Sequence, residues 1–576
     1  MRESSGAFAW VRAALFWALC GGAQSLAFAA TPVSWMVWLG WIPIAWLALD
    51  ASRASRTGRH VVAAWWSGWV FWLCTIPWIA HTISVHGGLP GWLGAILLGL
   101  LAAYMALYQA AFVAVSGRLR TPRATASGWL FRAAVLAGLW AGLEWLRERL
   151  FSGFPWAPLG EALVGTAGAL DLAPWIGGRG LSMVVVFWSV VCALLLDTEW
   201  KTRRSGVGGP GNGASADLTG RRRLAIQLWA GTALAAVLLL GLASVTGERR
   251  ASRWSVEDPS MPPDDLRALA RTTTRIVHVV QPNVPILRDG AEFVRNYQRL
   301  LELSSCNIPG TLIVWPESAA FPYLWERHQS FREDIRSIVS RGCDLLFNSA
   351  ISVETEDGPG TTNAALLASW KEDERRVEVQ RYDKMHLVPY GEYVPLKDVL
   401  PFVRQLARSV GEFEPGEDLF LPEWKDVDLG VSICFEVVFP YEVAERARLG
   451  ADLLAVITND AWFGRSAAPA QHLASARMRA AENRRPLVFA ATTGISAVVD
   501  ERGGIRSSIP LEKPGSLQLI LRGRSDVVDI EEPWDLTFYS RAPWAIDLFA
   551  ALLVILGFLA GRELAPKDAE TEAAVR

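Results

Sequence analysis

The sequence is short of charge: 20% of its 576 residues are Asp, Glu, Lys or Arg, whereas soluble domains average about 25%. The deficit lies in residues 1–245 and again near the C-terminus, while the stretch between them has an ordinary mixture. This distribution excludes a purely soluble enzyme, and a hydrophobic content of 51% excludes a disordered chain. We therefore expect one part embedded in a membrane and another part that is soluble.

Features that mark several other protein classes are also absent. The formal net charge is −2 and no basic stripe dominates, so nucleic-acid binding has no support. The seven histidines show no metal-ligand spacing, no Gly-x-Ser-x-Gly motif is present, and no glycine-rich phosphate loop follows a predicted strand. Six cysteines in a chain of this length exclude a small disulfide scaffold. We expect neither a metal nor any other cofactor.

Long apolar runs are abundant, and eight of them approach the roughly 20 residues that a helix needs to cross a membrane. Trp and Tyr gather at the ends of several runs, as they do at membrane interfaces. Residues 1–246 are therefore expected to form a membrane domain of seven helices, and residues 541–576 a final transmembrane helix and a tail. The eight expected spans are Ala13–Ala30, Val33–Leu49, Val61–Ala80, Trp92–Val115, Gly128–Trp145, Leu181–Leu196, Leu224–Val245 and Trp544–Gly561.

Basic residues are distributed unequally between the two sides of these spans. With a cytoplasmic N-terminus, the loops on the cytoplasmic side carry twelve Lys and Arg residues, against three on the other side. The positive-inside rule then places residues 247–540 outside the cytoplasm and the C-terminus inside. A cleavable signal peptide, suggested by Arg2, Arg12 and Ala27–Ala29, is a competing interpretation of the first span that leaves the soluble domain on the same side.

Two connections between spans have unusual compositions. The segment Phe151–Ile176 is apolar but contains three prolines and two acidic residues. It is either an irregular connection or a re-entrant or interfacial segment facing the soluble domain, and we favour the second because irregular backbone at membrane depth must be satisfied by protein or water. The segment Ser205–Ala216 is rich in Gly and Ser and is expected to be a flexible linker.

The region from about residue 270 to 530 alternates short β-type runs with amphipathic segments, which predicts a layered α/β domain with one core. The expected strands are Arg275–Val280, Thr311–Val314, Asp344–Ser349, Ala364–Ala368, Asp428–Ile433, Leu453–Ile457 and Leu487–Ala491. The expected helices are Ala291–Ser304, Leu324–Arg341, Tyr441–Leu449 and Gln471–Asn483.

Three of the cysteines, Cys306, Cys343 and Cys434, lie in this expected soluble domain. Because the number is odd, at least one of them is expected to be unpaired. A free thiol is noteworthy in an oxidising compartment. The sequence leaves open whether Cys306 and Cys343 form a disulfide or remain two buried thiols.

Three motifs offer groups that could act together in nucleophilic catalysis. Each alone is compatible with an ordinary structural role, since a cysteine that ends an apolar strand is usually part of a core. Together they offer a thiol nucleophile, a carboxylate to take its proton and an ammonium to stabilise an oxyanion. Separate strands ending at one edge of an α/β core would let the three groups meet. The motifs are Val314–Ser318 with Glu317, Tyr382–Pro395 with Lys384 and Glu392, and Val431–Glu436 with Cys434.

These motifs, in this order, resemble the carbon–nitrogen hydrolase (nitrilase) superfamily, whose fold is a four-layer α-β-β-α sandwich. The whole chain, with seven spans, a soluble domain and a final span, resembles the apolipoprotein N-acyltransferase family of bacterial inner membranes. Further matches are Glu144–Arg147, Gly153–Trp156, Gln281–Pro285, Thr458–Gly464, Gln471-His472, Arg479-Ala480 with Glu482, and Thr493–Ser496. The resemblance implies a nitrilase-like sandwich inserted between transmembrane helices 7 and 8 of an eight-helix membrane domain.

The resemblance also implies roles for individual residues. Glu317 would be the general base, Lys384 the oxyanion-stabilising cation and Cys434 the nucleophile. Glu392 and Glu436 would be accessory acidic residues.

The sequence departs from the family pattern at two places. Phe435 stands where many members have a tyrosine, so packing is expected to persist without a hydroxyl group. The stretch Ile286–Gly290 lacks the tryptophan expected on a mobile loop near the site entrance, so the details of the family's lid do not transfer to this chain.

The implied activity is ping-pong acyl transfer through a cysteine thioester. The acyl donor would be a phospholipid such as phosphatidylethanolamine, and the acceptor the N-terminal amine of the S-diacylglyceryl cysteine of an apolipoprotein. A membrane-tethered amidase of the same superfamily would share the three catalytic residues and is the alternative. A transporter with an extracytoplasmic binding domain is disfavoured, because the spans show no internal repeat and almost no charge at mid-membrane.

Overall fold

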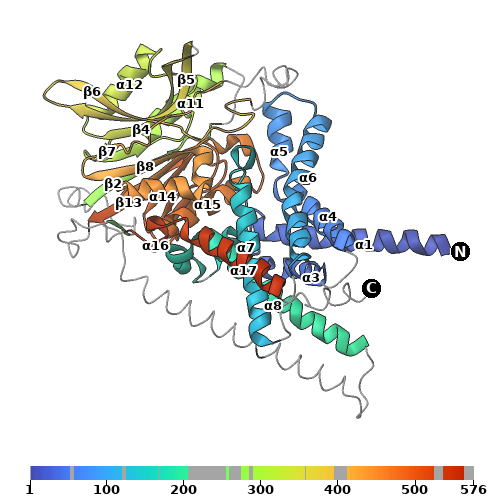
Figure 1. Cartoon of the computed structure of the whole chain (residues 1–576). Helices are drawn as coiled ribbons and strands as arrows, with labels where there is room; N and C mark the ends of the chain where they lie inside the picture. Colours follow the sequence, from blue (N-terminus) through green and yellow to red (C-terminus); the bar gives the residue numbers. More distant parts are fainter. Residues whose placement is uncertain are drawn as a thin grey trace.

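The computed structural model shows a β-sandwich beside a group of apolar helices (Figure 1). It describes residues 2–51, 57–119, 125–166, 168–204, 227, 254–257, 274–284, 290–356, 358–394, 412–523 and 536–563. The expected seventh span, Leu224–Val245, and the linker Ser205–Ala216 fall almost wholly outside the described residues, as do residues 286–289 of the loop discussed above.

The soluble part contains two sheets. The first has seven strands in the order β1-β13-β2-β3-β4-β5-β6, and the second has six in the order β12-β11-β10-β9-β8-β7. Strands β2, β3 and β4 are parallel, as are β8, β9 and β10. The bounds are β1 Trp254–Glu257, β2 Thr274–Gln281, β3 Leu312–Val314, β4 Asp344–Thr355, β5 Gly358–Lys371, β6 Arg376–Asp383, β7 Glu423–Trp424, β8 Val427–Ile433, β9 Leu453–Thr458, β10 Leu487–Ala491, β11 Ser496–Val499, β12 Ile505–Ile509 and β13 Gly515–Gly523.

Alternation along the strands separates the layers, because successive side chains of a strand point to opposite faces. In β3, Leu312 and Val314 join a core with Val431 of the second sheet, whereas Ile313 packs with Ile335 of a helix on the outer face. The helices are α11 (Gly290–Leu303) and α12 (Gln329–Val339) on the first sheet, and α14 (Pro440–Arg448) and α15 (Ala468–Asn483) on the second. The expected α-β-β-α sandwich is therefore confirmed.

The strands and helices expected in the soluble domain are all found, but one helix is shorter than predicted. The helix expected at Leu324–Arg341 begins only at Gln329. The backbone N–H of Leu324 donates to Nδ1 of His328, and that of Trp325 donates to the Ser349 hydroxyl. Because side chains satisfy these N–H groups, the chain forms turns here before the helix starts.

Six strands were not expected from the sequence, namely β1, β6, β7, β11, β12 and β13. For β6 the reason is its position at the edge of its sheet, where most of its side chains are only partly buried. Its sequence therefore lacks the apolar run that identifies a central strand.

Cys306 and Cys343 form a disulfide, which settles the pairing that the sequence leaves open. Their Cα atoms are 5.9 Å apart and 37 residues separate them in the sequence. The bond joins the segments that precede β3 and β4, so it lies at the amino ends of these two parallel strands. Cys434 remains a free thiol.

The helical part contains α1 to α8, α16 and α17. Within the described residues, four of its stretches are long and apolar enough to cross a membrane, and the bent pair Thr57–Thr75 and Trp78–His86 is a fifth if it forms one span. The four are Trp10–Phe28, Gly91–Ser116, Ser127–Arg147 and Ala169–Asp197. They correspond to the first, fourth, fifth and sixth expected spans. The bounds are α1 Arg2–Ser25, α2 Met36–Gly40, α3 Ile42–Ala51, α4 Thr57–Thr75, α5 Trp78–His81, α6 Gly91–Ser116, α7 Ala126–Arg147, α8 Ala169–Arg204, α16 Phe538–Arg541 and α17 Ala545–Glu563.

The second and third expected spans are not continuous helices. The second is divided into α2 and α3, and Pro43 has no N–H to donate to the Leu39 carbonyl. The third is divided at Pro77, where α4 and the following helical segment meet at a bend of 56°. The eighth is a shorter apolar helix, Ala545–Ala560.

The segment Phe151–Ile176 contacts the soluble domain. It contains a 3₁₀-helix, η4 (Leu159–Gly165), and α8 begins within it at Ala169. The Trp156 indole donates to Oε1 of Gln471 in α15 at 2.6 Å, and the Ser475 hydroxyl donates to Oε2 of Glu161 at 2.8 Å. The segment therefore faces the sandwich, as the favoured interpretation expects.

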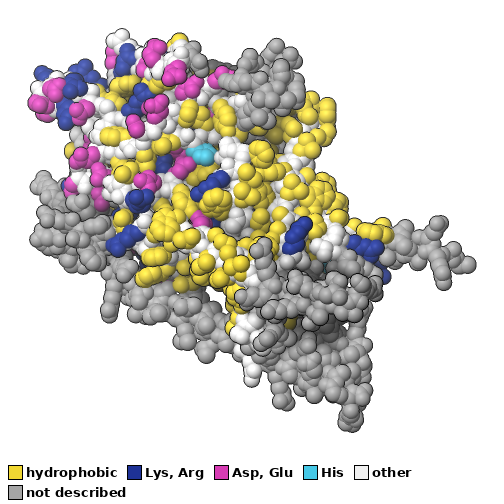
Figure 2. Space-filling view, in the orientation of Figure 1, with side chains coloured by type: hydrophobic (Ala, Val, Ile, Leu, Met, Phe, Trp, Pro, Cys, Tyr) yellow, Lys and Arg dark blue, Asp and Glu magenta, His cyan; other side chains and the backbone are white. Residues whose placement is uncertain are grey.

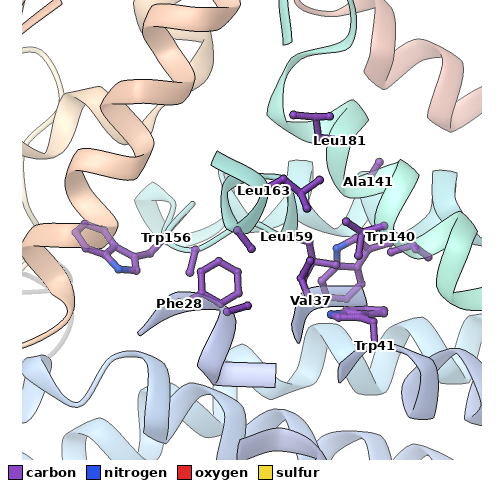
Figure 3. Close-up of a cluster of buried hydrophobic side chains, with 14 of the residues drawn as sticks. Phe28, Val37, Trp41, Trp140, Ala141, Trp156, Leu159, Leu163 and Leu181 are labelled. Carbon is purple, nitrogen blue, oxygen red and sulfur yellow. The ribbon is translucent and has the colours of Figure 1, made fainter. Parts of the chain in front are cut away.

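Aromatic side chains fill the centre of the helical part. Figure 3 shows side chains of α2, α7, η4 and α8 gathered in one cluster with Trp41, which lies between α2 and α3. The ring centroids of Trp41 and Trp140 are 4.3 Å apart. Outside this core, hydrophobic side chains cover the helical part in Figure 2, whereas charged side chains gather over the far end of the sandwich. This surface is typical of a protein whose helices lie in lipid.

Candidate active site

The three residues predicted to act together lie just past the ends of three strands. Glu317 follows β3, Lys384 follows β6 and Cys434 follows β8. All three are buried. The carboxyl ends of parallel strands meet at one edge of a sheet, and two facing sheets bring the edges together. The sandwich thus collects the three side chains from widely separated parts of the sequence.

The Glu317 carboxylate is held from two sides. Oε1 accepts a hydrogen bond from Nδ2 of Asn363 at 2.9 Å, and Oε2 accepts one from the backbone N–H of Asn459 at 3.0 Å. Oε1 also lies 3.8 Å from Nζ of Lys384. These contacts fix the carboxylate beside the ammonium group of Lys384.

Glu392 lies in the same cluster, as predicted. Nζ of Lys384 donates to Oε1 of Glu392 at 2.8 Å, and Nδ2 of Asn363 donates to the same oxygen at 2.8 Å. The backbone N–H of Val388 donates to Oε2 of Glu392 at 2.8 Å. Glu392 therefore anchors the ammonium group and leaves Glu317 with the longer, weaker contact to it.

Cys434 has an unusual backbone conformation. Its φ angle is +53°, in the left-handed region that residues other than glycine rarely adopt. Such a residue costs about 1–3 kcal/mol and persists only where the surroundings enforce it. It opens the 3₁₀-helix η5 (Cys434–Val438), and its carbonyl lies 3.1 Å from Nε2 of His472.

Burial and neighbouring charges set the protonation of the cluster. Burial raises the pKa of the Cys434 thiol above its ordinary range and the Glu317 carboxylate raises it further, while Lys384 lowers it. Burial also raises the pKa of Glu317, against the pull of Lys384. Burial alone would lower the pKa of Lys384, but the Glu392 and Glu317 carboxylates outweigh it and raise that pKa. The resting site is thus a thiol beside a basic carboxylate and an ammonium ion.

Glu436 belongs to a different network. It accepts hydrogen bonds from the Tyr382 hydroxyl at 2.7 Å, the Met385 N–H at 2.8 Å and the Ile433 N–H at 2.7 Å, and it pairs with Arg446 at 3.3 Å. These contacts join the segment that carries the lysine to the segment that carries the cysteine. Its described contacts are therefore those of a residue that holds two strand ends together.

The residues around the site include some that sequence analysis did not assign to it. Asn363 lies within β5 and gives no signal in the sequence. Thr458, Asn459 and His472 belong to motifs of the family resemblance but carry no role in the prediction. The Thr458 side chain lowers the pKa of the neighbouring Cys434 thiol through a hydrogen bond.

Aromatic rings surround Phe435, the residue after the cysteine. Its ring centroid lies 6.5 Å from that of Trp156 and 6.4 Å from that of Phe154, both in stacked orientation. Packing at this position therefore does not depend on a hydroxyl group. The two partner rings come from the segment that connects α7 to α8.

The α-β-β-α sandwich and the buried Glu–Lys–Cys cluster define a protein of the carbon–nitrogen hydrolase class. Residues 277–521 match the carbon–nitrogen hydrolase family model, and residues 20–191 match the model of the apolipoprotein N-acyltransferase N-terminal domain. The chain belongs to the apolipoprotein N-acyltransferase family.

Relatives match over almost the whole chain. The apolipoprotein N-acyltransferase of Geobacter metallireducens is 30% identical over 94% of this chain and 94% of its own. That of Ralstonia nicotianae is 32% identical over 95% of this chain and 93% of its own. Among solved structures, a mutant of the nitrilase-superfamily amidase from Nesterenkonia AN1 is 21% identical and covers 44% of this chain and 92% of that chain, with a TM-score of 0.31.

Proposed function

We propose that the chain moves an acyl chain from a phospholipid to the N-terminal amine of the S-diacylglyceryl cysteine of apolipoproteins, the last step of lipoprotein maturation. The observation that carries the proposal is the buried Glu317–Lys384–Cys434 cluster in a sandwich packed directly on apolar helices. Both substrates are anchored by acyl chains, so an enzyme built on membrane helices can act on them without extracting them from lipid. Membership of the family supports the same activity.

In the first half-reaction Cys434 takes the acyl chain. Glu317 removes the thiol proton as the sulfur attacks the ester carbonyl carbon, and the Lys384 ammonium stabilises the resulting oxyanion. Collapse of the tetrahedral intermediate breaks the ester C–O bond. The proton on Glu317 passes to the departing oxygen, which leaves as the hydroxyl of a lysophospholipid, and a thioester remains on Cys434.

In the second half-reaction the acyl chain passes from the Cys434 sulfur to an amine. The lipoprotein α-amine attacks the thioester carbonyl, Lys384 again stabilises the oxyanion, and Glu317 takes a proton from the nitrogen. The C–S bond breaks, the amide forms and the thiolate regains its proton from Glu317. Glu392 contributes by holding the ammonium of Lys384 at 2.8 Å. Burial of the cluster protects the thioester from hydrolysis by bulk water.

The finer features of the proposal follow the family resemblance. The donor is phosphatidylethanolamine, and its sn-1 chain is transferred. The sandwich, residues 247–540, stands between the seventh and eighth of eight spans on the periplasmic face of the inner membrane, with both termini cytoplasmic. The unequal distribution of basic residues supports this orientation. The Cys306–Cys343 disulfide supports it as well, because disulfides persist in oxidising compartments.

The orientation predicts the oxidation state of two cysteines in cells. Free thiols are blocked with N-ethylmaleimide in denaturing acid-quenched lysate, and disulfides are then reduced and labelled with a maleimide of high mass. The wild-type chain is expected to gain two labels, and a control with Cys306→Ser and Cys343→Ser none. A wild-type chain without labels would contradict the periplasmic side, because cytosolic thiols stay reduced.

The acyltransferase activity predicts a coupled pair of products. Purified protein in detergent micelles with acyl-labelled phosphatidylethanolamine and a diacylglyceryl lipopeptide is expected to yield N-acylated lipopeptide and lysophospholipid in equal amounts. Lipopeptide with a blocked α-amine serves as the control and should leave the label on the protein. Release of free acid instead of N-acylated product would favour the membrane-tethered amidase.

A further inference from the structure

His472 lies next to the nucleophile but takes no part in the proton transfers described above. It belongs to α15 and is fully buried. Its Nε2 lies 3.1 Å from the Cys434 carbonyl oxygen, and its Nδ1 lies 3.0 Å from Oδ1 of Asp460. The side chain thus connects a buried carboxyl group to the backbone of the cysteine.

The hydrogen-bond chemistry fixes the direction of the contact between His472 and Cys434. A carbonyl oxygen can only accept, so Nε2 of His472 donates to Cys434. Asp460 faces Nδ1 and also accepts from the Thr458 hydroxyl at 2.9 Å. Gly494 packs so closely against the Asp460 carboxylate that a Cβ atom at residue 494 would lie 2.4 Å from Oδ2 of Asp460. The carboxylate therefore has little room to move. Asp460 therefore orients the imidazole so that Nε2 points at the carbonyl.

The residue before His472 binds the helical part. Nε2 of Gln471 donates to the carbonyl oxygens of Phe28 at 2.7 Å and Thr75 at 3.0 Å, close to the ends of α1 and α4. Its Oε1 accepts from the Trp156 indole. Consecutive residues of one helix therefore contact the apolar helices and the backbone of the nucleophile.

We propose that His472 is a positioning residue that holds the Cys434 carbonyl, and that Gln471 makes this position depend on the docking of α15 against the apolar helices. Cys434 needs such support because its φ of +53° is maintained only by its surroundings. A hydrogen bond to its carbonyl fixes the peptide group between residues 434 and 435 and, with it, the direction of the thiol. The inference rests on the proposed function only in taking Cys434 as the nucleophile.

Two substitutions of His472 separate positioning from packing. His472→Gln keeps an N–H group that can reach the Cys434 carbonyl but loses the ring that packs against Trp156 and Phe489. His472→Phe keeps a ring and loses the donor. We expect thioester formation from labelled phospholipid to slow about 10- to 100-fold in His472→Phe and to stay within about 3-fold of wild type in His472→Gln, with KM for the donor unchanged in both. A purely structural role predicts the reverse order and would overturn the proposal.

A second readout does not depend on the substrate. Alkylation of Cys434 by iodoacetamide, followed by peptide mass spectrometry on the full chain in detergent micelles, is expected to slow in the same order. If this order holds while wild type forms no thioester from phospholipid, the proposed function fails and the positioning role stands. If thioester forms but the two variants react equally fast with both probes, the positioning role fails alone.

Gln471→Leu tests the link to the apolar helices and lies outside the Asp460–His472 pair. We expect it to slow thioester formation about 10-fold, and the double variant Gln471→Leu/His472→Phe to be no slower than His472→Phe alone, because both act along one path. Effects that multiply would show that the two residues act independently and would overturn the dependence on docking. Gln471→Leu also keeps the proposal testable if His472→Phe does not accumulate in membranes.

Discussion

Cys434→Ala is expected to reduce acyl transfer to the uncatalysed level and to abolish the acyl-enzyme. The thiol is the proposed nucleophile of the buried cluster. Glu317 and Lys384 are held in place by hydrogen bonds to Asn363 and Glu392, so neither can take the position of the thiol and attack the acyl carbon. The measurement is mass spectrometry of protein from membranes or after incubation with phosphatidylethanolamine. The wild type should carry an acyl adduct on Cys434, and Cys434→Ala none.

The three cysteines of the helical part provide the matched control. Cys20, Cys74 and Cys192 lie in the helical part, and a chain in which all three are alanine should form the adduct normally. Cys434→Ser should also fail to accumulate an adduct, because a buried hydroxyl is a poorer nucleophile than a thiol beside the same base. Full acyl transfer by Cys434→Ala would remove the basis of the thioester mechanism.

Glu317→Gln is expected to slow thioester formation by about 10²- to 10⁴-fold, the usual contribution of a positioned general base. The substitution keeps the size of the side chain but removes the group that takes the thiol proton. Since burial raises the pKa of the Cys434 thiol, little thiolate forms without the base. Single-turnover formation of labelled acyl-enzyme measures the effect on the first half-reaction alone.

The pH dependence gives this prediction a sharper form. Because burial raises the pKa of Cys434 above its ordinary range, an increase to about pH 9, slightly above the ordinary thiol value of about 8.5, should not restore thioester formation in Glu317→Gln. The control is Glu333→Gln, the same change at an exposed position of α12, where the Glu333 carboxylate accepts a hydrogen bond from Gln329. This variant should behave as wild type. Rescue of Glu317→Gln at that pH would mean that the thiol ionises without the carboxylate.

The proposed catalytic cluster was predictable from three motifs taken together and from the family resemblance, since each motif alone is compatible with an ordinary structural role. Cys434 directly follows a buried apolar strand and Glu317 lies three residues past another, whereas Lys384 follows a strand that has no apolar run. Asn363 was not predictable, because an asparagine inside β5 becomes a site residue only when the other strand ends meet it. The role of His472 depends on a contact across 38 residues of sequence, which no local pattern encodes.

The membrane helices show a different limit of sequence patterns. Hydropathy over a window correctly located apolar segments but did not register the missing N–H groups of Pro43, two residues after the interruption at Trp41, and of Pro77, which lies between α4 and α5. The Cys306–Cys343 bond was equally beyond reach, since it depends on how two loops lie at the start of β3 and β4. These features arise from single backbone groups and from tertiary distances.

The contact between α15 and the apolar helices bears on whether the sandwich can exist alone. The core that buries Leu487 and Phe489 of the second sheet continues without interruption to Phe28 and Trp156 of the helical part. Across the same boundary, the Ser475 hydroxyl bonds Glu161. Proteolytic cleavage at residue 247 would therefore not yield an active soluble fragment. The separated sandwich would expose the apolar side chains of the shared core and polar groups that had lost their hydrogen-bond partners. The fold of the sandwich, and with it the proposed activity, therefore depends on the apolar helices that share its core.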